Sequence, residues 1–138
     1  MVEAMAERES GDVFRGAWEI TSTEVWDKDA LDLVAQAQIR FDGRKGELAM
    51  IAVQGWLDCR YLERDGRPAV EFSWEGEDEG DQRCGRGWAV LKPDGKLQGR
   101  LFFHMGDDSA FSAVRTQAGK KRSGRTGRRR PSPPLAPL

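Results

Sequence analysis

The sequence predicts an all-β protein, an antiparallel meander barrel of about eight strands with one short helix between the first two. Three observations lead to this prediction. Apolar and polar residues alternate with period two over most of residues 13–115, as in strands that bury one face. Turn sequences rich in Gly, Asp and Pro separate these segments. The same stretch holds enough aromatic volume to fill a small barrel, including the tryptophans Trp18, Trp26, Trp56, Trp74 and Trp88.

The first predicted strand begins at Phe14 and places Trp18 and Ile20 on one face. Asp27 follows and is suited to cap a helix, because its carboxylate can accept hydrogen bonds from the free N–H groups of a first turn. A helix this short is not stable alone, so we expect it to lie on the sheet or across the mouth of the barrel. The apolar face of this two-turn helix would consist of Ala30, Leu31 and Val34.

The next strand covers residues 37–41 and turns at residues 42–46. Residues 47–64 then alternate over a length that exceeds an ordinary strand. We therefore expect a tight turn at Gln54-Gly55 that divides them into two strands, and a sharp bend in one long strand is the alternative. Asp65-Gly66 is a strong hairpin signal, because a type I′ turn needs residues that accept positive φ.

The second half continues as a series of strands joined by short turns. An acidic loop is predicted over residues 76–85, turns at 93–95 and 106–109, and a last strand over 110–115. Short connections favour neighbouring antiparallel strands, and closing the meander removes its exposed edges. The residues predicted to face inward are Val70, Phe72, Trp74, Trp88, Val90, Leu97, Gly99, Leu101, Phe103 and Met105.

Size and charge divide the chain into three parts. A length of 138 residues fits one domain, which we place at residues 13–115, after a mobile N-terminus over residues 1–12. The net charge of −1 conceals an asymmetry, since all 23 acidic residues precede the tail at 116–138 while seven of the 22 basic residues lie within it. The tail combines these with Gly, Ser and Pro, a composition that predicts disorder.

The cysteine content and the absence of long apolar segments indicate a cytoplasmic protein. Cys59 and Cys84 are too few for a disulfide scaffold, and we expect both thiols to be free. The first twelve residues are acidic and lack the apolar stretch of a signal peptide. No window approaches the length of apolar sequence that a membrane span requires.

The segment Gly16-Ala-Trp18 is similar to the Gly-x-Trp opening of the calycin superfamily, the lipocalins and fatty-acid-binding proteins. The resemblance implies a cup-shaped barrel with an internal site for a small apolar ligand, and a first-strand tryptophan covered by a basic residue of the last strand. Arg115 is the candidate for that basic residue. The lipocalin C-terminal helix and the second lid helix of the fatty-acid-binding proteins have no counterpart here, and the longer nitrobindin motif is not continued.

A second resemblance covers residues 65–113. Three strings within it, at 71–76, 85–89 and 103–111, resemble a family of small bacterial proteins to which no activity is assigned. This likeness supports the predicted fold and implies no function.

We predict a site for a small apolar ligand inside the barrel, with the helix after Asp27 as its gate. The predicted ligand-binding residues are Trp18, Trp74, Trp88, Phe103, His104 and Arg115. No catalytic residue, metal site or cofactor is predicted. His104 is the only histidine, and a catalytic triad or zinc site needs partners that no motif supplies. The acidic run at 75–81 lacks the EF-hand order, so a solvated loop is expected rather than a calcium site.

An interaction module without an internal ligand is the alternative function. In that interpretation the aromatics form only the core, and the acidic loop or the basic tail binds a protein partner. The tail could also contact the phosphates of nucleic acid, but it has no aromatic residue to stack on bases, and the acidic body would oppose such binding. A third hypothesis is an enzyme with His104 as general base.

Overall fold

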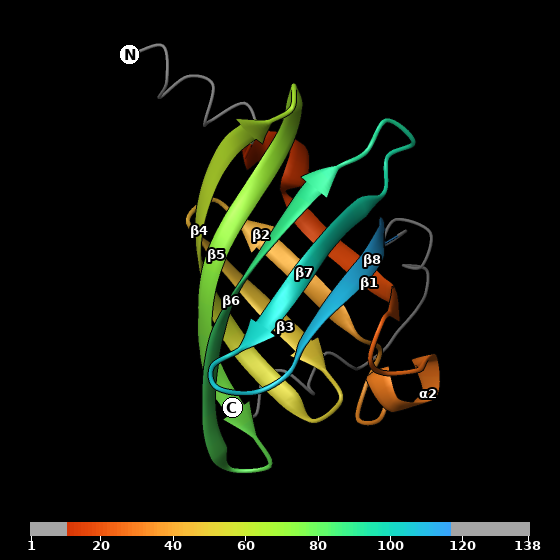
Figure 1. The fold of residues 1–138 in the computed structure, drawn as a ribbon, viewed down its shortest axis with the longest axis vertical. Coiled ribbons are helices and arrows are strands. Elements are labelled where there is room, and N and C mark those ends of the chain that lie inside the picture. Colours follow the sequence, from red (N-terminus) through yellow and green to blue (C-terminus); the bar gives the residue numbers. More distant parts are fainter. Residues whose placement is uncertain (1–10, 117–138) are drawn as a thin grey trace, which may run out of the picture.

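The computed structural model describes residues 11–116, and these form a closed barrel of eight antiparallel strands (Figure 1). Each strand pairs with the next in chain order, and β8 closes the barrel by pairing with β1. The predicted fold class is therefore confirmed. Most of the predicted N-terminal segment, and the tail beyond Thr116, lie outside the described residues. The strands are β1 (Gly16–Thr23), β2 (Gln38–Asp42), β3 (Lys45–Met50), β4 (Val53–Arg64), β5 (Arg67–Asp78), β6 (Asp81–Leu91), β7 (Leu97–Phe103) and β8 (Asp108–Arg115).

The helix predicted between the first two strands is present as α2 (Lys28–Leu31), and Asp27 caps it as expected by accepting a hydrogen bond from the Ala30 N–H at 2.9 Å. It has one turn rather than two, and Val34 is exposed. The carboxylate of Asp32 accepts the Ala37 N–H at 2.8 Å and thereby directs the chain into β2. Leu31 is fully buried, so the helix is anchored to the barrel by a single apolar side chain.

Residues 47–64 form two strands, as expected, but the turn between them lies at residues 51–52 and not at Gln54-Gly55. Ile51 adopts a φ of 59° there. Gly55 instead lies within β4, where an added Cβ would approach the Trp74 ring to 3.0 Å. This glycine makes room for an aromatic ring rather than a turn.

The acidic segment predicted as a loop is a long hairpin of β5 and β6, which pair as far as Asp78 and Asp81. Glu79 and Gly80 form its two-residue turn, with φ values of 55° and 90°. Asp65 and Gly66 have φ values of 54° and 78°, which confirms the hairpin predicted there. A run of carboxylates was compatible with strand structure because alternate side chains of an exposed hairpin lie in water.

Side chains fill the barrel interior. The largest fully buried ones include Trp18, Phe14, Phe41 and Phe111. Glycines of neighbouring strands accommodate the bulky rings. An added Cβ at Gly87 would meet the Phe72 ring at 2.5 Å, and one at Gly99 would meet the Phe111 ring at 2.8 Å. The interior is an aromatic core as predicted, but of the five tryptophans only Trp18 and Trp74 are buried in it. The packing leaves the ends of the barrel as places where a ligand can be held.

Trp88, Val90 and Met105 do not face inward, which corrects the prediction. The register pairs Trp88 with Glu71 and Arg100, on the outer face of the sheet. Met105 lies in the β7–β8 turn and is 93% exposed. The inward positions of β6 are Gly85, Gly87 and Ala89, and the two glycines lie opposite the Trp74 and Phe72 rings of β5.

Candidate ligand-binding mouth of the barrel

One end of the barrel is closed by the segment that precedes β1. Trp18 is 1% exposed, and its indole N–H donates to the Phe14 carbonyl at 2.8 Å. The Arg115 guanidinium lies over the Trp18 ring, 4.2 Å from its centroid, and donates to the carbonyls of Val13 and Arg15 at 2.6 and 2.8 Å. This is the packing of a last-strand cation on a first-strand tryptophan that the resemblance of Gly16-Ala-Trp18 to the calycin opening implied.

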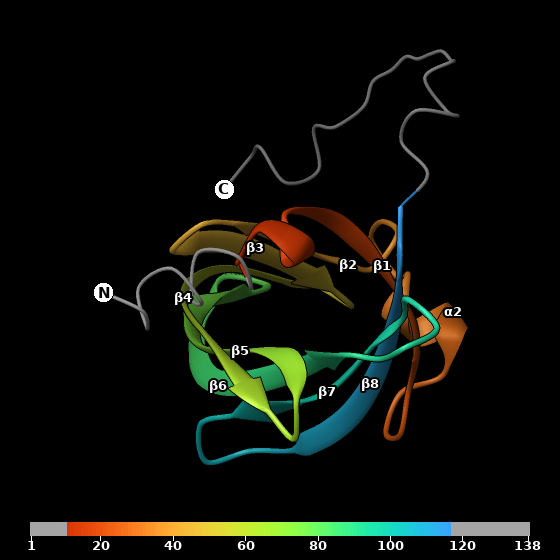
Figure 2. The same ribbon diagram turned by 90° about the horizontal axis from the view of Figure 1, so that it is seen from above.

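Further aromatic contacts seal the same end, which Figure 2 views from above. The Phe14 ring lies 5.6 Å from the Phe41 ring and 5.8 Å from the Tyr61 ring. The Tyr61 hydroxyl donates to the Gly43 carbonyl at 2.5 Å. Burial raises the pKa of Tyr61 well above its usual range and that of the neighbouring Cys59 thiol to about 11, so both remain neutral. Buried aromatic rings and neutral side chains therefore pack the closed end.

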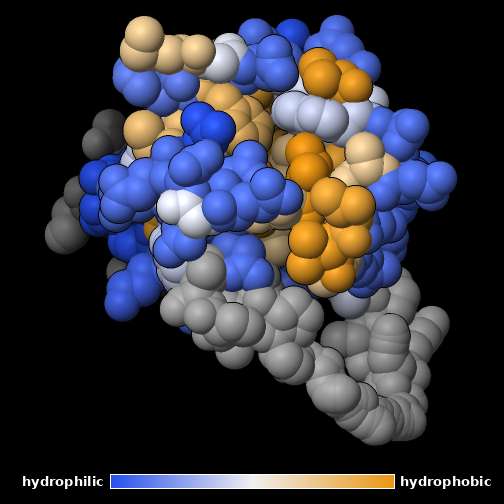
Figure 3. All heavy atoms as spheres, turned by 90° about the horizontal axis from the view of Figure 1, so that it is seen from below, coloured by the Kyte–Doolittle hydropathy of each residue, from blue (hydrophilic) through white to orange (hydrophobic). Residues whose placement is uncertain are grey.

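The opposite end holds a pocket of about 950 Å³, open to solvent. It lies where the β3–β4, β5–β6 and β7–β8 turns meet, and Figure 3 looks onto this end. In that view a group of hydrophobic residues lies right of centre, with hydrophilic residues on both sides of it. The apolar part of the lining includes Trp26, Ile51, Val53, Trp56 and Phe103, and the polar part includes Glu75, Glu77, Asp78, Arg83, His104 and Asp107.

Three aromatic rings connect the pocket to the core. Phe103 lies 5.8 Å from Trp26 on one side and 5.1 Å from Trp74 on the other, nearly perpendicular to the latter. Trp74 is 2% exposed, and its indole N–H donates to the Phe102 carbonyl at 3.3 Å. The Phe103–Trp74 pair thus separates the pocket from the barrel interior, while Trp26 remains accessible.

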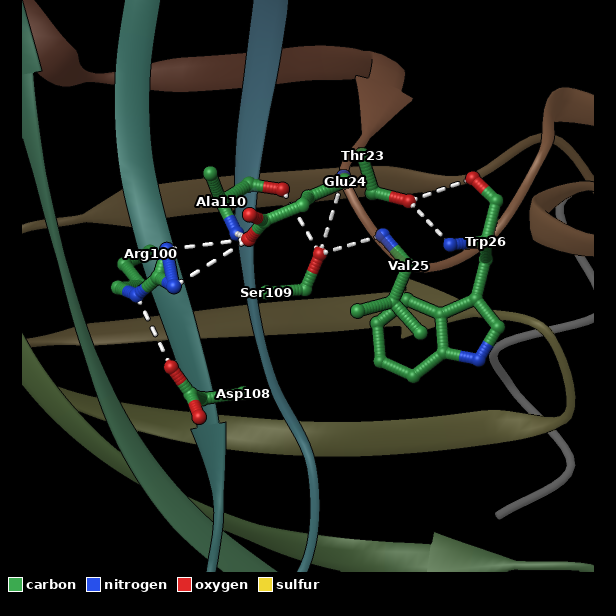
Figure 4. A network of polar contacts seen from close by, with 8 residues as sticks. All are labelled: Thr23, Glu24, Val25, Trp26, Arg100, Asp108, Ser109 and Ala110. Carbon is green, nitrogen blue, oxygen red and sulfur yellow. Dashed lines mark hydrogen bonds and ion pairs between the residues drawn. The ribbon is translucent and has the colours of Figure 1, made fainter.

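Backbone hydrogen bonds hold Trp26 in place (Figure 4). The Thr23 hydroxyl accepts the Trp26 N–H at 2.9 Å and donates to the Trp26 carbonyl at 2.6 Å. The buried Ser109 hydroxyl accepts the N–H groups of Glu24 and Val25, each at 3.1 Å, and donates to the Ala110 carbonyl. The Ser109 bonds join the segment after β1 to β8, and the Thr23 bonds fix the backbone that carries the Trp26 side chain.

An ion-pair network supports the same junction from the outer face. Arg100 contacts Asp108 at 3.0 Å and Glu24 at 3.2 Å. At α2, the Lys28 ammonium forms ion pairs with the carboxylates of Asp32 and Glu19. Burial opposes the Lys28 charge, but the hydrogen bonds and charges of the two carboxylates outweigh it and raise its pKa. The carbonyl of Leu31 accepts the Ile51 N–H at 2.7 Å, which ties α2 to the rim of the pocket.

The charges of the pocket lining are unbalanced. Four carboxylates face one guanidinium, which gives −3 with His104 neutral. Arg83 lies 4.0 Å from Asp78, a long ion pair. Within residues 11–116, Glu75, Glu77 and Asp107 have no basic side chain within ion-pair distance. In the described part of the chain, the mouth is thus an apolar surface bordered by carboxylates that lack ion-pair partners.

His104 is exposed at the rim, where its backbone N–H donates to the Cys84 carbonyl at 2.7 Å. No hydrogen bond joins its imidazole to another side chain among the described residues. Cys84 is exposed and Cys59 buried, and both are free. Within the same part of the chain, no group of three or more His, Cys, Asp or Glu residues is placed to hold a metal ion, and no helix is long and apolar enough to cross a membrane.

The six predicted ligand-binding residues are divided among three places. Trp18 and Arg115 form the closed end, and Trp74 lies beneath the mouth. Phe103 and His104 line the pocket. Trp88 lies on the outer wall in a shallow hollow of about 500 Å³, beneath the Arg64 guanidinium at 5.1 Å.

Three residues that line the pocket were not predicted to belong to the site, namely Trp26, Trp56 and Ile51. They belong to three different segments, and only the closure of the barrel brings them together. A signal for Trp26 was available, since it precedes the capping Asp27 and thus lies where the first strand leaves the sheet. No local signal marks Trp56, which is 45% exposed on β4.

No family model matches this chain, and no curated protein is significantly similar to it.

Proposed function

We propose that this protein binds one small amphiphilic organic molecule at the open mouth of its barrel. The observation that carries the proposal is the pocket of about 950 Å³, whose apolar side is built from Trp26, Phe103, Ile51 and Val53. A volume of this size is in the range of known small-molecule sites, roughly 300–1,000 Å³. An apolar wall with a few convergent polar groups is the usual composition of such sites.

The packed interior supports a ligand at the mouth rather than deep within the barrel. Trp74 and Phe103 are in contact beneath the pocket, and the interior beyond them is filled by buried side chains. A ligand could enter further only if these rings moved apart, which would expose apolar surface and leave the Trp74 indole N–H without its Phe102 acceptor. The site therefore differs from a central cavity with the aromatics as its lining.

A titration with N-phenyl-1-naphthylamine, a neutral apolar fluorophore, tests the proposal. We expect saturable binding of one molecule per chain, with quenching of tryptophan emission. Trp26→Ala removes one apolar wall, while Thr23 continues to hold the backbone at that position. Loss of the contacts of a partly exposed indole corresponds to about 1–2 kcal/mol, so the dissociation constant should increase roughly tenfold.

Trp88→Ala is the matched control. It removes another half-buried tryptophan from the outer wall, far from the pocket lining. We expect its affinity for the fluorophore to equal that of the unmodified chain. Binding without saturation, or equal losses in both variants, would contradict a ligand site at the mouth.

A further inference from the structure

We infer that the ligand of this pocket is an organic cation, a quaternary or protonated amine on an apolar body. The inference deepens the proposed function and depends on it. It follows from two features that meet at the mouth, carboxylates without an ion-pair partner among residues 11–116 and accessible indole rings, together with the closure of the floor beneath them.

The first step concerns charge. The lining carries four carboxylates and one guanidinium, and the guanidinium of Arg83 is already shared with Asp78. Glu75 and Glu77 lie on β5 and Asp107 in the β7–β8 turn, so negative charge borders the pocket from two sides. An anionic ligand such as a fatty carboxylate would be repelled, whereas a cation would reduce the repulsion among these groups.

The second step concerns the aromatic rings. Trp26 lies against Phe103 and remains partly accessible, and Trp56 is 45% exposed at the rim. The face of an indole ring attracts a cation more strongly than other aromatic side chains do. Trp56 is paired with Glu75 in the β4–β5 register, so an ammonium group at the rim would find an aromatic ring and a carboxylate on adjacent strands.

The third step concerns the apolar part of the ligand. Phe103, Ile51 and Val53 line the pocket, and Val53 is 2% exposed. A chain or ring attached to the ammonium group can cover this apolar wall while the charge remains near the carboxylates and water. Inorganic cations would leave the apolar wall uncovered, and no ring of oxygen ligands is assembled among residues 11–116 to hold one.

Three octyl compounds with the same chain and different head groups test the inference by isothermal titration calorimetry on the full chain. They are octyltrimethylammonium, octan-1-ol and octanoate. Because the carboxylates are partly solvated, we expect the cation to bind roughly tenfold more tightly than the alcohol, and octanoate more weakly than both. Raising the salt concentration should reduce the difference between cation and alcohol, since exposed charges are screened.

A charge-matched pair of variants locates the effect. Glu75→Gln with Asp107→Asn removes two carboxylates from the mouth. Glu63→Gln with Asp65→Asn makes the same chemical changes at the β4–β5 turn, away from the pocket lining, where asparagine tolerates the positive φ of Asp65. The mouth variant should lose most of the preference for the cation, and the control variant should retain it.

The outcomes separate this inference from the proposed function. Equal affinity for the cation and the alcohol, or tighter binding of octanoate, would overturn the cation assignment while the pocket remained a ligand site. Equal effects of the two variants would show that net charge alone, and not the mouth, determines the preference, and would also overturn it. Failure of all three compounds and of the neutral fluorophore to bind would overturn the proposed function itself.

Discussion

Substitution of Gly87 by alanine tests whether the Phe72 ring of β5 and the glycine opposite it on β6 are matched in size. The added Cβ would lie 2.5 and 2.7 Å from the Cζ and Cε1 atoms of Phe72 and 2.9 Å from the carbonyl oxygen of Arg100. Phe72 is 4% exposed and surrounded by core residues, and the Arg100 carbonyl belongs to the β7 backbone, so neither can move freely. Overpacking of this kind costs about 1–3 kcal/mol.

Alanine gains up to about 1 kcal/mol from the lower backbone entropy of the unfolded chain, which offsets part of this cost. We therefore expect Gly87→Ala to lower the free energy of unfolding by about 1–2 kcal/mol, measured by urea denaturation followed by circular dichroism. Gly106→Ala serves as the control, because its Cβ would meet nothing closer than 3.3 Å.

A double-mutant cycle with Phe72→Leu makes the assay specific. Leucine lacks the ring atoms that the new Cβ would meet, so Gly87→Ala should cost less in the leucine background than in the native one, by about 1 kcal/mol. Equal costs in the two backgrounds, or a Gly87→Ala variant as stable as the unmodified chain, would refute the proposed complementarity between Phe72 and Gly87.

Three further predictions concern the closed end, the helix and the thiols. Arg115→Gln removes the cation from the Trp18 ring and weakens two hydrogen bonds to carbonyls. The free energy of unfolding measured by urea denaturation should therefore fall by about 2 kcal/mol, and an unchanged value would contradict a role of Arg115 in closing the barrel end. Burial opposes the charge on Asp32, but the Ala37 N–H and Lys28 lower its pKa below 3.8, so its contribution to stability is present above that value and lost as the pH falls through the folded pKa. Asp32→Asn should therefore lose less stability than the unmodified chain on acidification, measured as the shift of the urea midpoint. Because burial raises the pKa of Cys59 to about 11, Ellman's reagent should titrate only Cys84 rapidly in the native protein, and rapid reaction of two thiols would show that the core around Cys59 is open.

Features determined by neighbouring residues could be predicted from the sequence. Asp65-Gly66 forms a hairpin because its two residues accept positive φ, and Asp27 caps α2 because its carboxylate reaches the first turn. The contact of Arg115 on Trp18 was expected only from the resemblance of Gly16-Ala-Trp18 to the calycin opening, and the β1–β8 register pairs these two residues.

Features that depend on the size of side chains in neighbouring strands could not be predicted in the same way. Hydrophobicity placed Trp88 inside the barrel, but the Trp74 and Phe72 rings of β5 leave room only for glycines at the inward positions 85 and 87 of β6. Which of two alternating faces is buried therefore depended on the size of residues in another strand. In Gly85-Arg-Gly-Trp88-Ala, small residues alternate with large ones. This pattern indicates the observed inward face of β6 only if the small residues are taken as the interior ones.

The mouth of the barrel was difficult to predict for a related reason. Its lining comes from the ends of several strands and their turns, and the acidic composition of the β5–β6 hairpin suggested a loop. Phe103 and His104 were assigned to a ligand site from the sequence, whereas Trp26 and Trp56 were seen only as core residues.

The indole N–H signals of the five tryptophans in a ¹H–¹⁵N spectrum give the most direct test of a ligand site at the mouth above a packed interior. On titration with octyltrimethylammonium, we expect the signals of Trp26 and Trp56 to shift and saturate together, while the signal of Trp18 at the closed end and that of Trp88 on the outer wall stay in place. A saturable shift of Trp18 with Trp26 and Trp56 unaffected would contradict the account, because the ligand would then bind away from the mouth.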